Sequence, residues 1–392
     1  MLKKQQARKN LNIIGLNSGT SADGIDLAAV KVNIVSKKLT VKFLAGKTIR
    51  YPAKLQSRLH DAIDNRMISI DEFIRLDREL GHFYGMQAER FRRNLKNKGV
   101  AVNLVASHGQ TVRHLPGKVK IDRSKQSATL QLGHPETIAA TTGLLTVADF
   151  RQSDIACGGE GAPITTTAMH LLFADKKNDR MLVNIGGISN YFFFPRGKNR
   201  KYMTASDCGP GNSLIDIIAK KSFGKNLDRN GSLAARGNIS KRLLSIMSAD
   251  SFLKGKYGPS TGKERFGGKF ADKIIRAGSK LRLNKYDIMA TTTELTAVAI
   301  MRAIKKKLEK HNINHVYLLG GGLKNKYLLK RMHENMPGVR FISVSELGYD
   351  PDYLEAVCYA VMGAMTVASR PSGLYHVTGA AKDSIAGRII QP

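Results

Sequence analysis

The amino-acid sequence predicts an α/β protein built from two domains. Its 392 residues are more than one ordinary hydrophobic core accommodates. A hydrophobic content of 42% and 37 glycines are typical of a well-packed chain with many tight turns. In addition, the pattern of residues 13–30 (IIGLNSGTSADGIDLAAV) returns in residues 182–194 (LVNIGGISNYFFF). In both, a turn of small residues joins two apolar strands, which indicates two halves of similar design.

The first half reads as strands followed by helices. Residues 11–35 and 39–50 are rich in β-branched residues and predict a hairpin or meander. Residues 54–97 predict helix, because apolar side chains recur there every three or four positions. Residues 102–111 form a short buried strand that ends in a polar turn. Residues 128–150 then carry a strand, a helix that starts at Pro135, and another strand.

The second half begins near Met181 with the repeated strand–turn–strand pattern. Residues 291–311 predict a long amphipathic helix, and residues 315–332 a strand, a triple-glycine turn and a helix. We therefore predict an N-terminal domain of residues 11–150 plus about 355–392, and a C-terminal domain of residues 151–354. No linker or low-complexity segment separates them.

The charge of the chain bears on its partners. A formal net charge of +32 predicts long-range attraction to polyanions such as nucleic acid, anionic cell-wall fragments or anionic lipid. The basic residues are spread over helix faces and loops, however, and no basic run is interleaved with aromatic residues as a stacking platform would be. We interpret the charge as a solvated surface, and a polyanion-binding protein is the alternative.

Cysteine and hydropathy patterns exclude several classes of protein. The three cysteines and ten histidines are scattered, without the spacing of a disulfide framework or a zinc site. No apolar run approaches the roughly 18 residues that span a bilayer, and the apolar stretch behind the basic start is too short for a secretory signal. We expect a cytoplasmic protein without a membrane partner. The oligomeric state stays open, a homodimer included.

The turn within residues 12–30 has the composition of a phosphate-binding loop. Its glycines let backbone N–H groups approach an anion closely, and its serine and threonine hydroxyls add donors. Asp23 and Asp26 are candidate ligands of Mg²⁺ or of its water molecules. The alternative is an ordinary hairpin turn of small residues.

Ten motifs that follow one another along the chain then point to a family. They are SGTSADGID, SHGQTVRH, ADFRQSDIACGGEGAPI, NIGGISN, DCGPGN, GPSTGKERF, TELTA, LLGGG, DPDYLEA and YHVTGA. This ordered set resembles that of the anhydro-N-acetylmuramic acid kinases and covers nearly the whole chain. The resemblance implies two actin-like (ribonuclease H-like) domains with a nucleotide cleft between them, and ATP and Mg²⁺ as cofactors. It also implies a small-molecule substrate, 1,6-anhydro-N-acetylmuramic acid, an intermediate of peptidoglycan recycling. Members of the family hydrolyse its anhydro bridge and phosphorylate the 6-oxygen.

The resemblance also assigns residues to the nucleotide and the metal. Asp23 and Asp26 would serve Mg²⁺, although Asp26 could equally be an ordinary carboxylate at a strand edge. The residues assigned to the nucleotide are Gly19, Thr20, Ser21, Ala22, Asp23, Gly24, Ile25, Asp26, Asn184, Gly186, Gly187, Asp207, Gly209, Gly211, Asn212, Gly320, Gly321 and Gly322.

Asp154 matches the catalytic aspartate of the family. The reaction needs a carboxylate that removes a proton from the attacking water. A capping or loop aspartate is the structural alternative for Asp154, and Asp149 is the rival base.

The residues assigned to the sugar are His108, Gln110, Arg113, Arg151 and Glu294. A planar guanidinium suits the lactyl carboxylate of the substrate, which makes the two arginines its candidates. His108 could instead be a structural histidine at a strand end, and Glu294 a surface carboxylate on a helix.

At four positions the chain departs from the usual family pattern. Asn17 stands in place of Met, His134 in place of Asp, Glu160 in place of Gln, and Cys208 in place of Thr. We expect Cys208 to remove a hydroxyl donor beside the phosphates, and His134 to change the charge on the sugar side. A kinase of the same fold acting on another sugar or acyl substrate is therefore a second alternative. The GPSTGKE segment, with three residues between its glycines and Glu264 after the lysine, is not a Walker A loop.

Overall fold

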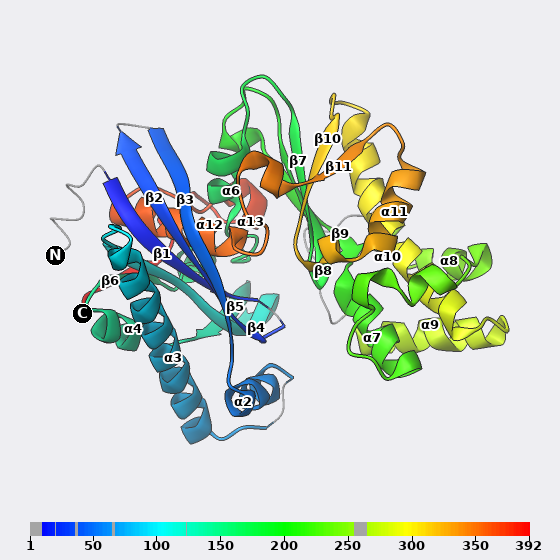
Figure 1. Ribbon diagram of the computed structural model, residues 1–392, viewed down its shortest axis with the longest axis horizontal. Helices are drawn as coiled ribbons and strands as arrows, with labels where there is room; N and C mark the ends of the chain where they lie inside the picture. The colour runs from blue at the N-terminus through cyan, green and yellow to red at the C-terminus, as the bar shows by residue number, and fades with distance from the viewer. Residues whose placement is uncertain (1–9, 20, 36–37, 65–66, 123, 255–264) are drawn as a thin grey trace. The chain divides into compact units, whose positions relative to one another are not determined.

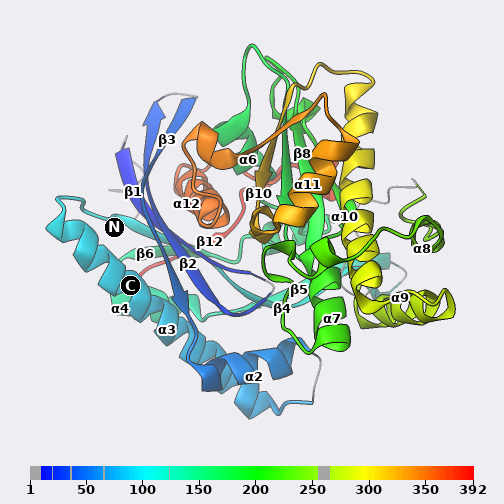
Figure 2. The same ribbon diagram turned by 45° about the vertical axis from the view of Figure 1, so that its right-hand side comes forward.

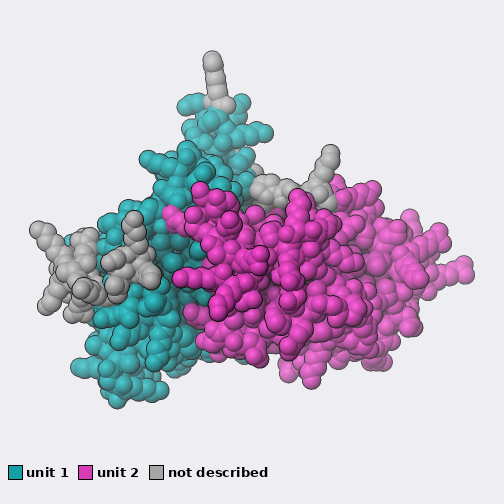
Figure 3. All heavy atoms as spheres, turned by 90° about the horizontal axis from the view of Figure 1, so that it is seen from above, with its two compact units in different colours: residues 1–172, 353–392 teal, residues 173–352 magenta. Residues whose placement is uncertain are grey.

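A computed structural model describes residues 10–19, 21–35, 38–64, 67–122, 124–254 and 265–392. The chain divides into two compact units, coloured separately in Figure 3. Unit 1 comprises Met1–Leu172 and Tyr353–Pro392, and unit 2 comprises Phe173–Asp352. Residues 151–172, which the sequence-based division assigned to the second domain, belong to unit 1. GPSTGKE, residues 258–264, lies outside the described residues.

Unit 1 is built on one mixed sheet of seven strands. Its strands are β1 (Asn10–Ser18), β2 (Gly24–Val35), β3 (Lys38–Arg50), β4 (Leu104–Ile121), β5 (Ser124–Leu132), β6 (Leu145–Ala148) and β12 (Arg388–Ile390). They are ordered β12-β6-β4-β1-β2-β3, and β5 pairs with β4. The first three strands form an antiparallel meander, and β4 and β6 continue the sheet in parallel beside β1.

Unit 2 is built on a sheet of five strands. Its strands are β7 (Arg180–Ile185), β8 (Ile188–Phe194), β9 (Thr204–Pro210), β10 (His315–Leu319) and β11 (Arg340–Ser343). The order is β11-β10-β7-β8-β9, with an antiparallel meander β7-β8-β9 and with β10 and β11 parallel beside β7.

The two sheets therefore share one topology. In each, three antiparallel strands stand in the order third, second, first, and two parallel strands follow beside the first (Figure 1). This is the strand order of the actin-like, ribonuclease H-like fold. The prediction of two halves that each begin with a strand–turn–strand segment is confirmed.

Helices cover both faces of the unit 1 sheet. The helices of this unit are α2 (Ala53–Ile63), α3 (Ile70–Asn97), α4 (Pro135–Thr142), α5 (Gln152–Ala156), α6 (Thr166–Phe173), α12 (Leu354–Val367) and α13 (Tyr375–Thr378). Of these, α3 lies on one face of the sheet and α12 on the other. The helical region predicted for residues 54–97 is two helices, and Ser69 caps the second by accepting a hydrogen bond from the N–H of Glu72 at 3.1 Å. As predicted, α4 begins at Pro135.

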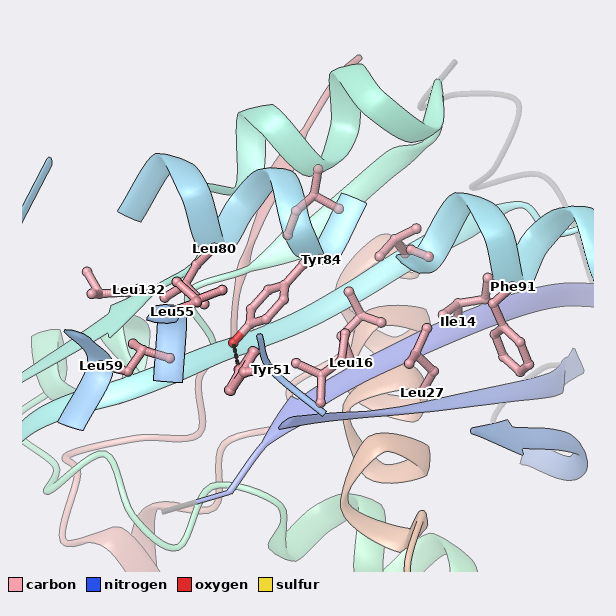
Figure 4. Close-up of a cluster of buried hydrophobic side chains, with 14 of the residues drawn as sticks. Ile14, Leu16, Leu27, Tyr51, Leu55, Leu59, Leu80, Tyr84, Phe91 and Leu132 are labelled. Carbon is pink, nitrogen blue, oxygen red and sulfur yellow. Dashed lines mark hydrogen bonds between the residues drawn. The ribbon is translucent and has the colours of Figure 1, made fainter. Parts of the chain in front are cut away.

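The main core of unit 1 lies between its sheet and α2 and α3. Figure 4 shows Leu16 and Leu27 from the strands among Leu80 and Phe91 from α3, all of them buried. On the other face, α12 approaches β1 so closely that a Cβ atom at Gly15 would lie 1.9 Å from the carbonyl oxygen of Ala356. The end of β1 is thus held rigidly between two layers of helix (Figure 2).

In unit 2 the longest helix is buried over its first half and amphipathic over its last turns. The unit contains α7 (Asn212–Phe223), α8 (Lys241–Ser248), α9 (Gly268–Lys280), α10 (Lys285–Leu308) and α11 (Lys326–Asn335). It also contains the short helices η1 (Arg200–Tyr202), η2 (Arg229–Gly231), η3 (Ala234–Arg236), η4 (Gly321–Lys324) and η5 (Val344–Leu347). Helix α10 begins earlier than predicted, and residues 288–297 are buried. One side of it packs on the sheet and the other on α7–α9. Its C-terminal part, in contrast, exposes Arg302, Lys305 and Lys306 to solvent.

Among the described residues, none of the helices is both long and apolar enough to cross a membrane.

Candidate active site

The loop between β1 and β2 is a compact turn held at both ends. The N–H of Ala22 donates to the carbonyl of Gly19 at 3.1 Å, and the hydroxyl of Ser18 lies 2.8 Å from the carbonyl of Gly24. Ala22 has φ 49°, a strained value outside glycine. A Cβ atom at Gly24 would lie 2.3 Å from the carbonyl oxygen of Ile49, so only glycine fits there. Thr20 lies outside the described residues.

The two aspartates of this segment differ in exposure. Asp23 is exposed and accepts a hydrogen bond from the hydroxyl of Ser21 at 2.8 Å. Asp26 is half-buried on β2, opposite Asn17, and accepts a hydrogen bond from the hydroxyl of Thr48 at 2.6 Å. The segment joins two antiparallel strands, as predicted, and it presents one carboxylate to solvent.

A magnesium ion fits this loop only if the nucleotide brings most of its ligands. Within the described part of the chain, no three His, Cys, Asp or Glu side chains form a group that could hold a metal. Mg²⁺, however, is commonly bound by one or two carboxylates together with phosphate oxygens and water. The exposed carboxylate of Asp23, which has one hydroxyl donor, suits that arrangement.

The side chain of Gln110 contacts the β1–β2 loop and is not exposed to solvent. Its side chain is fully buried at the bend in β4, where Gly109 has φ 75°. Its carbonyl oxygen lies 2.5 Å from the hydroxyl of Ser18, and its amide nitrogen donates to the carbonyl of Gly19 at 3.2 Å. The structure therefore places this candidate for the sugar against the candidate loop for the phosphates.

His108 and Arg151 form a pair, as expected of residues in one site. The Nε of Arg151 donates to Nε2 of His108 at 3.1 Å, and its Nη1 donates to the carbonyl of Gly161 at 2.7 Å. The His108 ring is buried and stacks on Tyr359 with centroids 4.5 Å apart. Burial and the charge of Arg151 lower the pKa of His108 well below its usual range. The neutral ring thus orients Arg151. Arg113 lies farther along β4, opposite Leu130.

Asp154 is buried on the short helix α5, with 1% of the residue exposed. The hydroxyl of Thr378 donates to Oδ1 at 2.6 Å, and the N–H of Gly161 donates to Oδ2 at 2.8 Å. A carboxylate has about four lone-pair positions, so these two donors leave about two for a water molecule. The alternative of a helix cap is wrong, because the cap residue of α5 is Arg151.

The rival base is engaged elsewhere. Asp149 forms an ion pair with Arg388 of the C-terminal strand β12 and has φ 58°. Its carboxylate therefore joins two segments of unit 1.

Glu160 lies close to Asp154 without bonding to it. The side chain is half-buried, and burial followed by the charge of Asp154 raises its pKa. Its backbone N–H donates to the carbonyl of Thr378 at 2.8 Å. Thr378 is therefore tied to both acidic residues of this segment.

We expect Glu160→Gln to stabilise the protein at neutral pH. The folded protein holds a proton on Glu160 at pH values where the unfolded chain has lost it, so stability falls as the pH rises through the raised pKa. Glutamine removes this cost. At pH 7 the free energy of unfolding should increase by less than about 1 kcal/mol, which raises the melting temperature. Near pH 4 the melting temperature should stay unchanged. A shift that is equal at both pH values would contradict this prediction.

In unit 2, the predicted glycine turns come together at the end of β7. The N–H of Asn212 donates to the carbonyl of Gly186 at 2.8 Å, and the N–H of Gly211 donates to that of Gly187 at 3.1 Å. A Cβ atom at Gly211 would lie 2.3 Å from the Gly186 oxygen. The side-chain amide of Asn212 donates to the carbonyl of Ile185 at 3.1 Å. The β7–β8 turn and the start of α7 are therefore packed directly against each other.

The triple-glycine turn after β10 packs against the same strand end. Gly320 has φ 84°, and a Cβ atom there would lie 2.4 Å from Oδ1 of Asn184. A Cβ atom at Gly322 would lie 2.3 Å from the side chain of Ile185, whereas at Gly321 the nearest atom is 3.4 Å away. Because β7 and β10 are parallel, these turns mark the carboxyl edge of the sheet, where open α/β sheets bind ligands. Gly209, with φ 142°, and Asp207 lie nearby on β9.

Glu294 is not a surface carboxylate. It is buried on α10, where Nε of Arg331 donates to one oxygen at 2.6 Å and the amide of Asn335 donates to the other at 2.9 Å. The surface alternative is wrong. The carboxylate joins α10 to α11.

We expect Arg331→Met to destabilise unit 2 by about 2–3 kcal/mol, because it leaves the buried Glu294 carboxylate with Asn335 as its remaining side-chain donor. Urea unfolding at neutral pH measures the loss. The control is Lys221→Met, which removes the exposed 2.7 Å pair with Asp272 and should cost less than about 1 kcal/mol. Equal losses in the two variants would contradict the prediction.

Three of the four departures from the family pattern have structural roles. Cys208 packs in the hydrophobic core of unit 2. This buried position does not support the expectation that Cys208 removes a hydroxyl donor beside the phosphates. His134 caps α4, where its Nδ1 accepts a hydrogen bond from the N–H of Thr137 at 3.3 Å. The amide of Asn17 donates to Glu355 at 2.8 Å and so joins the end of β1 to the start of α12, a bond that methionine could not donate. The fourth, Glu160, is described above.

Sequence reasoning missed two residues that contact the site. Thr378 lies in YHVTGA, a motif without an assigned role, and its hydroxyl reaches Asp154 from a distant part of the chain. Tyr51 follows β3 and bonds to the β1–β2 loop. No local pattern marks Tyr51, because its role depends on how the strands pair.

Two repeated sheets with glycine turns at the carboxyl ends of their parallel strands define an actin-like α/β protein. The family model of anhydro-N-acetylmuramic acid kinase matches residues 11–392, and the chain belongs to this family. It is 34% identical over 383 residues to an anhydro-N-acetylmuramic acid kinase from Caldanaerobacter subterraneus, with 96% of each chain covered. It is also 34% identical over 379 residues to one from Coxiella burnetii, again with 96% of each chain covered.

A solved structure of the activator of 2-hydroxyisocaproyl-CoA dehydratase from Clostridium difficile, with bound ADPNP, aligns with a TM-score of 0.42 and 12% identity, covering 92% of this chain and 96% of that one.

Proposed function

We propose that the protein is an ATP-dependent kinase of 1,6-anhydro-N-acetylmuramic acid. It opens the anhydro bridge with water and transfers the γ-phosphoryl group of ATP to O6, which yields N-acetylmuramic acid 6-phosphate and ADP. The observation that carries this conclusion is the family match over residues 11–392, which includes Asp154 and both sets of glycine turns.

Two sets of backbone donors would bind ATP. The β1–β2 loop, residues 19–26, would hold the phosphates through its N–H groups and hydroxyls. Asp207, Gly209 and Gly211 would form a second turn on the phosphate side, with the turn at 186–187, Asn184 and Asn212 beside it. Gly320, Gly321 and Gly322 would contact the nucleoside. Mg²⁺, when bound, would neutralise phosphate charge, and Asp23 and Asp26 would hold it or its water molecules.

Asp154 would act as the general base. It takes a proton from a water molecule whose oxygen then bonds to the anomeric carbon C1. The C1–O6 bond breaks, O6 attacks the γ-phosphorus, and ADP leaves with the electrons of the broken P–O bond. The donors Thr378 and Gly161 would keep the Asp154 carboxylate oriented throughout.

The sugar would be bound chiefly through its charge. Arg113 and Arg151 would pair with the lactyl carboxylate, and neutral His108 would keep Arg151 in place. Gln110, whose side chain bonds to the β1–β2 loop, stays a proposed sugar ligand. Glu294 stays a proposed sugar ligand, and that role requires it to share its carboxylate with Arg331.

A substrate panel tests this function. Purified protein with ATP and Mg²⁺ should consume ATP only with the anhydro sugar, and the product should gain the mass of one phosphoryl group and one water. Gain of phosphate alone on another sugar or on an acyl substrate would favour the second alternative. Negligible ATP consumption together with tight, steeply salt-dependent binding of duplex DNA would favour the polyanion-binding alternative.

A further inference from the structure

We propose that Tyr51 is a positioning residue that holds the β1–β2 loop for ATP through a chain of buried hydroxyl groups. The inference rests on the proposed assignment of this loop to the phosphates. Tyr51 makes none of the proposed contacts with substrate or metal, and no family motif named above contains it.

Tyr51 holds both ends of the loop. Its hydroxyl donates to the hydroxyl of Ser18, the last residue of β1, at 2.8 Å. Its backbone N–H donates to the carbonyl of Asp23, the residue before β2, at 3.1 Å. One residue thus joins the entry and the exit of the turn that carries the exposed Asp23 carboxylate.

The direction of the hydrogen bonds is set by their acceptors. Ser18 has one hydroxyl proton, and two carbonyl oxygens surround it: that of Gly24 at 2.8 Å and that of the Gln110 amide at 2.5 Å. Since neither can donate, the single Ser18 proton is shared between them, and Ser18 accepts from Tyr51. The Tyr51 oxygen must then accept from Tyr84, whose hydroxyl oxygen lies 2.6 Å away (Figure 4).

The chain of hydrogen bonds continues into the loop. With its carbonyl oxygen facing Ser18, the Gln110 amide nitrogen faces the carbonyl of Gly19 and donates to it at 3.2 Å. The chain therefore runs from Tyr84 through Tyr51, Ser18 and Gln110 to Gly19. It fixes the first glycine of the loop from inside the protein.

The chain lies out of solvent. Tyr51, Tyr84, Ser18 and Gln110 are each at most 5% exposed. Burial raises the pKa of both tyrosines, so their hydroxyls remain protonated donors at neutral pH. Loss of one member would leave a buried polar atom without its partner, and the loop would relax to satisfy it.

Tyr51→Phe isolates this role, because the ring can keep its packing against Phe83, whose centroid is 5.4 Å away. We expect the KM for ATP to rise about tenfold, an effect on the order of one lost hydrogen bond. The KM for the anhydro sugar and kcat should change less than about twofold. Tyr84→Phe, one step farther from the loop, should act in the same direction with a smaller effect, and it replaces Tyr51→Phe if that variant does not fold.

Two controls separate positioning from stability. Leu59→Ala removes a buried side chain of the same core and should lower the melting temperature without changing either KM. Tyr286→Phe, in unit 2, should change neither the melting temperature nor the KM for ATP. A parallel rise in both KM values of Tyr51→Phe, or the same rise in Leu59→Ala, would overturn the inference in favour of a structural role.

Asp23→Asn distinguishes this inference from the loop assignment itself. If Asp23→Asn weakens ATP use while Tyr51→Phe leaves the KM for ATP unchanged, the positioning role is wrong and the loop assignment stands. If neither variant affects ATP, the assignment of the loop to the phosphates is wrong, and the positioning role is wrong with it.

Discussion

Asp154→Asn is expected to lower kcat by at least about 100-fold with the fold intact, because asparagine keeps the shape of the side chain but cannot take a proton from water. Thr378 and Gly161, which donate to the carboxylate, can rearrange around an amide at small cost. The KM for ATP should change little, since the proposed ATP contacts lie on other residues. Steady-state rates of ADP release with the anhydro sugar measure this effect.

The matched control is Asp149→Asn in the same segment. Asp149 pairs with Arg388, and its positive φ is one that asparagine adopts readily. We therefore expect this variant to retain most of the activity. Full activity of Asp154→Asn, or loss of activity in Asp149→Asn alone, would show that Asp154 is not the general base.

Gly159→Ala should have the second largest effect. A Cβ atom at this position would lie 2.3 Å from Oδ2 of Asp154, so the carboxylate has to move. Displacement of a catalytic group by about 1 Å can cost on the order of 100-fold in rate. The loss should fall on kcat and leave the KM for ATP near its original value.

Gly158→Ala is the control for this variant. It adds the same methyl group one residue earlier, where nothing lies within 4 Å. Its φ of 84° makes alanine strained, so stability should fall by about 1 kcal/mol while kcat stays within about twofold. If both variants lose activity equally, backbone strain explains the effect and displacement of Asp154 does not.

The fold was largely predictable because its signals are local. The strand–turn–strand pattern at 13–30 returns at 182–194, and each copy forms the first hairpin of a sheet with the same strand order. Proline at the start of α4 marked its boundary. The burial of α10 was not predictable from periodicity alone, because that helix packs on the sheet on one side and on α7–α9 on the other.

The residues of the candidate site were predictable where they lie in local turns. They were not predictable where a contact joins two segments that are distant in sequence. Gly211 and Gly320 were assigned from sequence, and the structure brings both against the end of β7. For Glu294, in contrast, sequence left a surface carboxylate as an equal alternative to a sugar ligand, and only the structure shows Arg331 of the next helix bonded to it. The contact of Thr378 with Asp154 joins residues far apart in sequence, so no local pattern reveals it.

The mass of the product tests the central claim most directly. Wild-type protein and Asp154→Asn are each incubated with ATP, Mg²⁺ and 1,6-anhydro-N-acetylmuramic acid, and the sugar is analysed by mass spectrometry. The wild type should convert the sugar to one product that has gained both a phosphoryl group and a water, and Asp154→Asn should leave it unconverted. A wild-type product that carries phosphate without water, or water without phosphate, would contradict bridge opening coupled to phosphoryl transfer. Full conversion by Asp154→Asn would contradict the role of that residue.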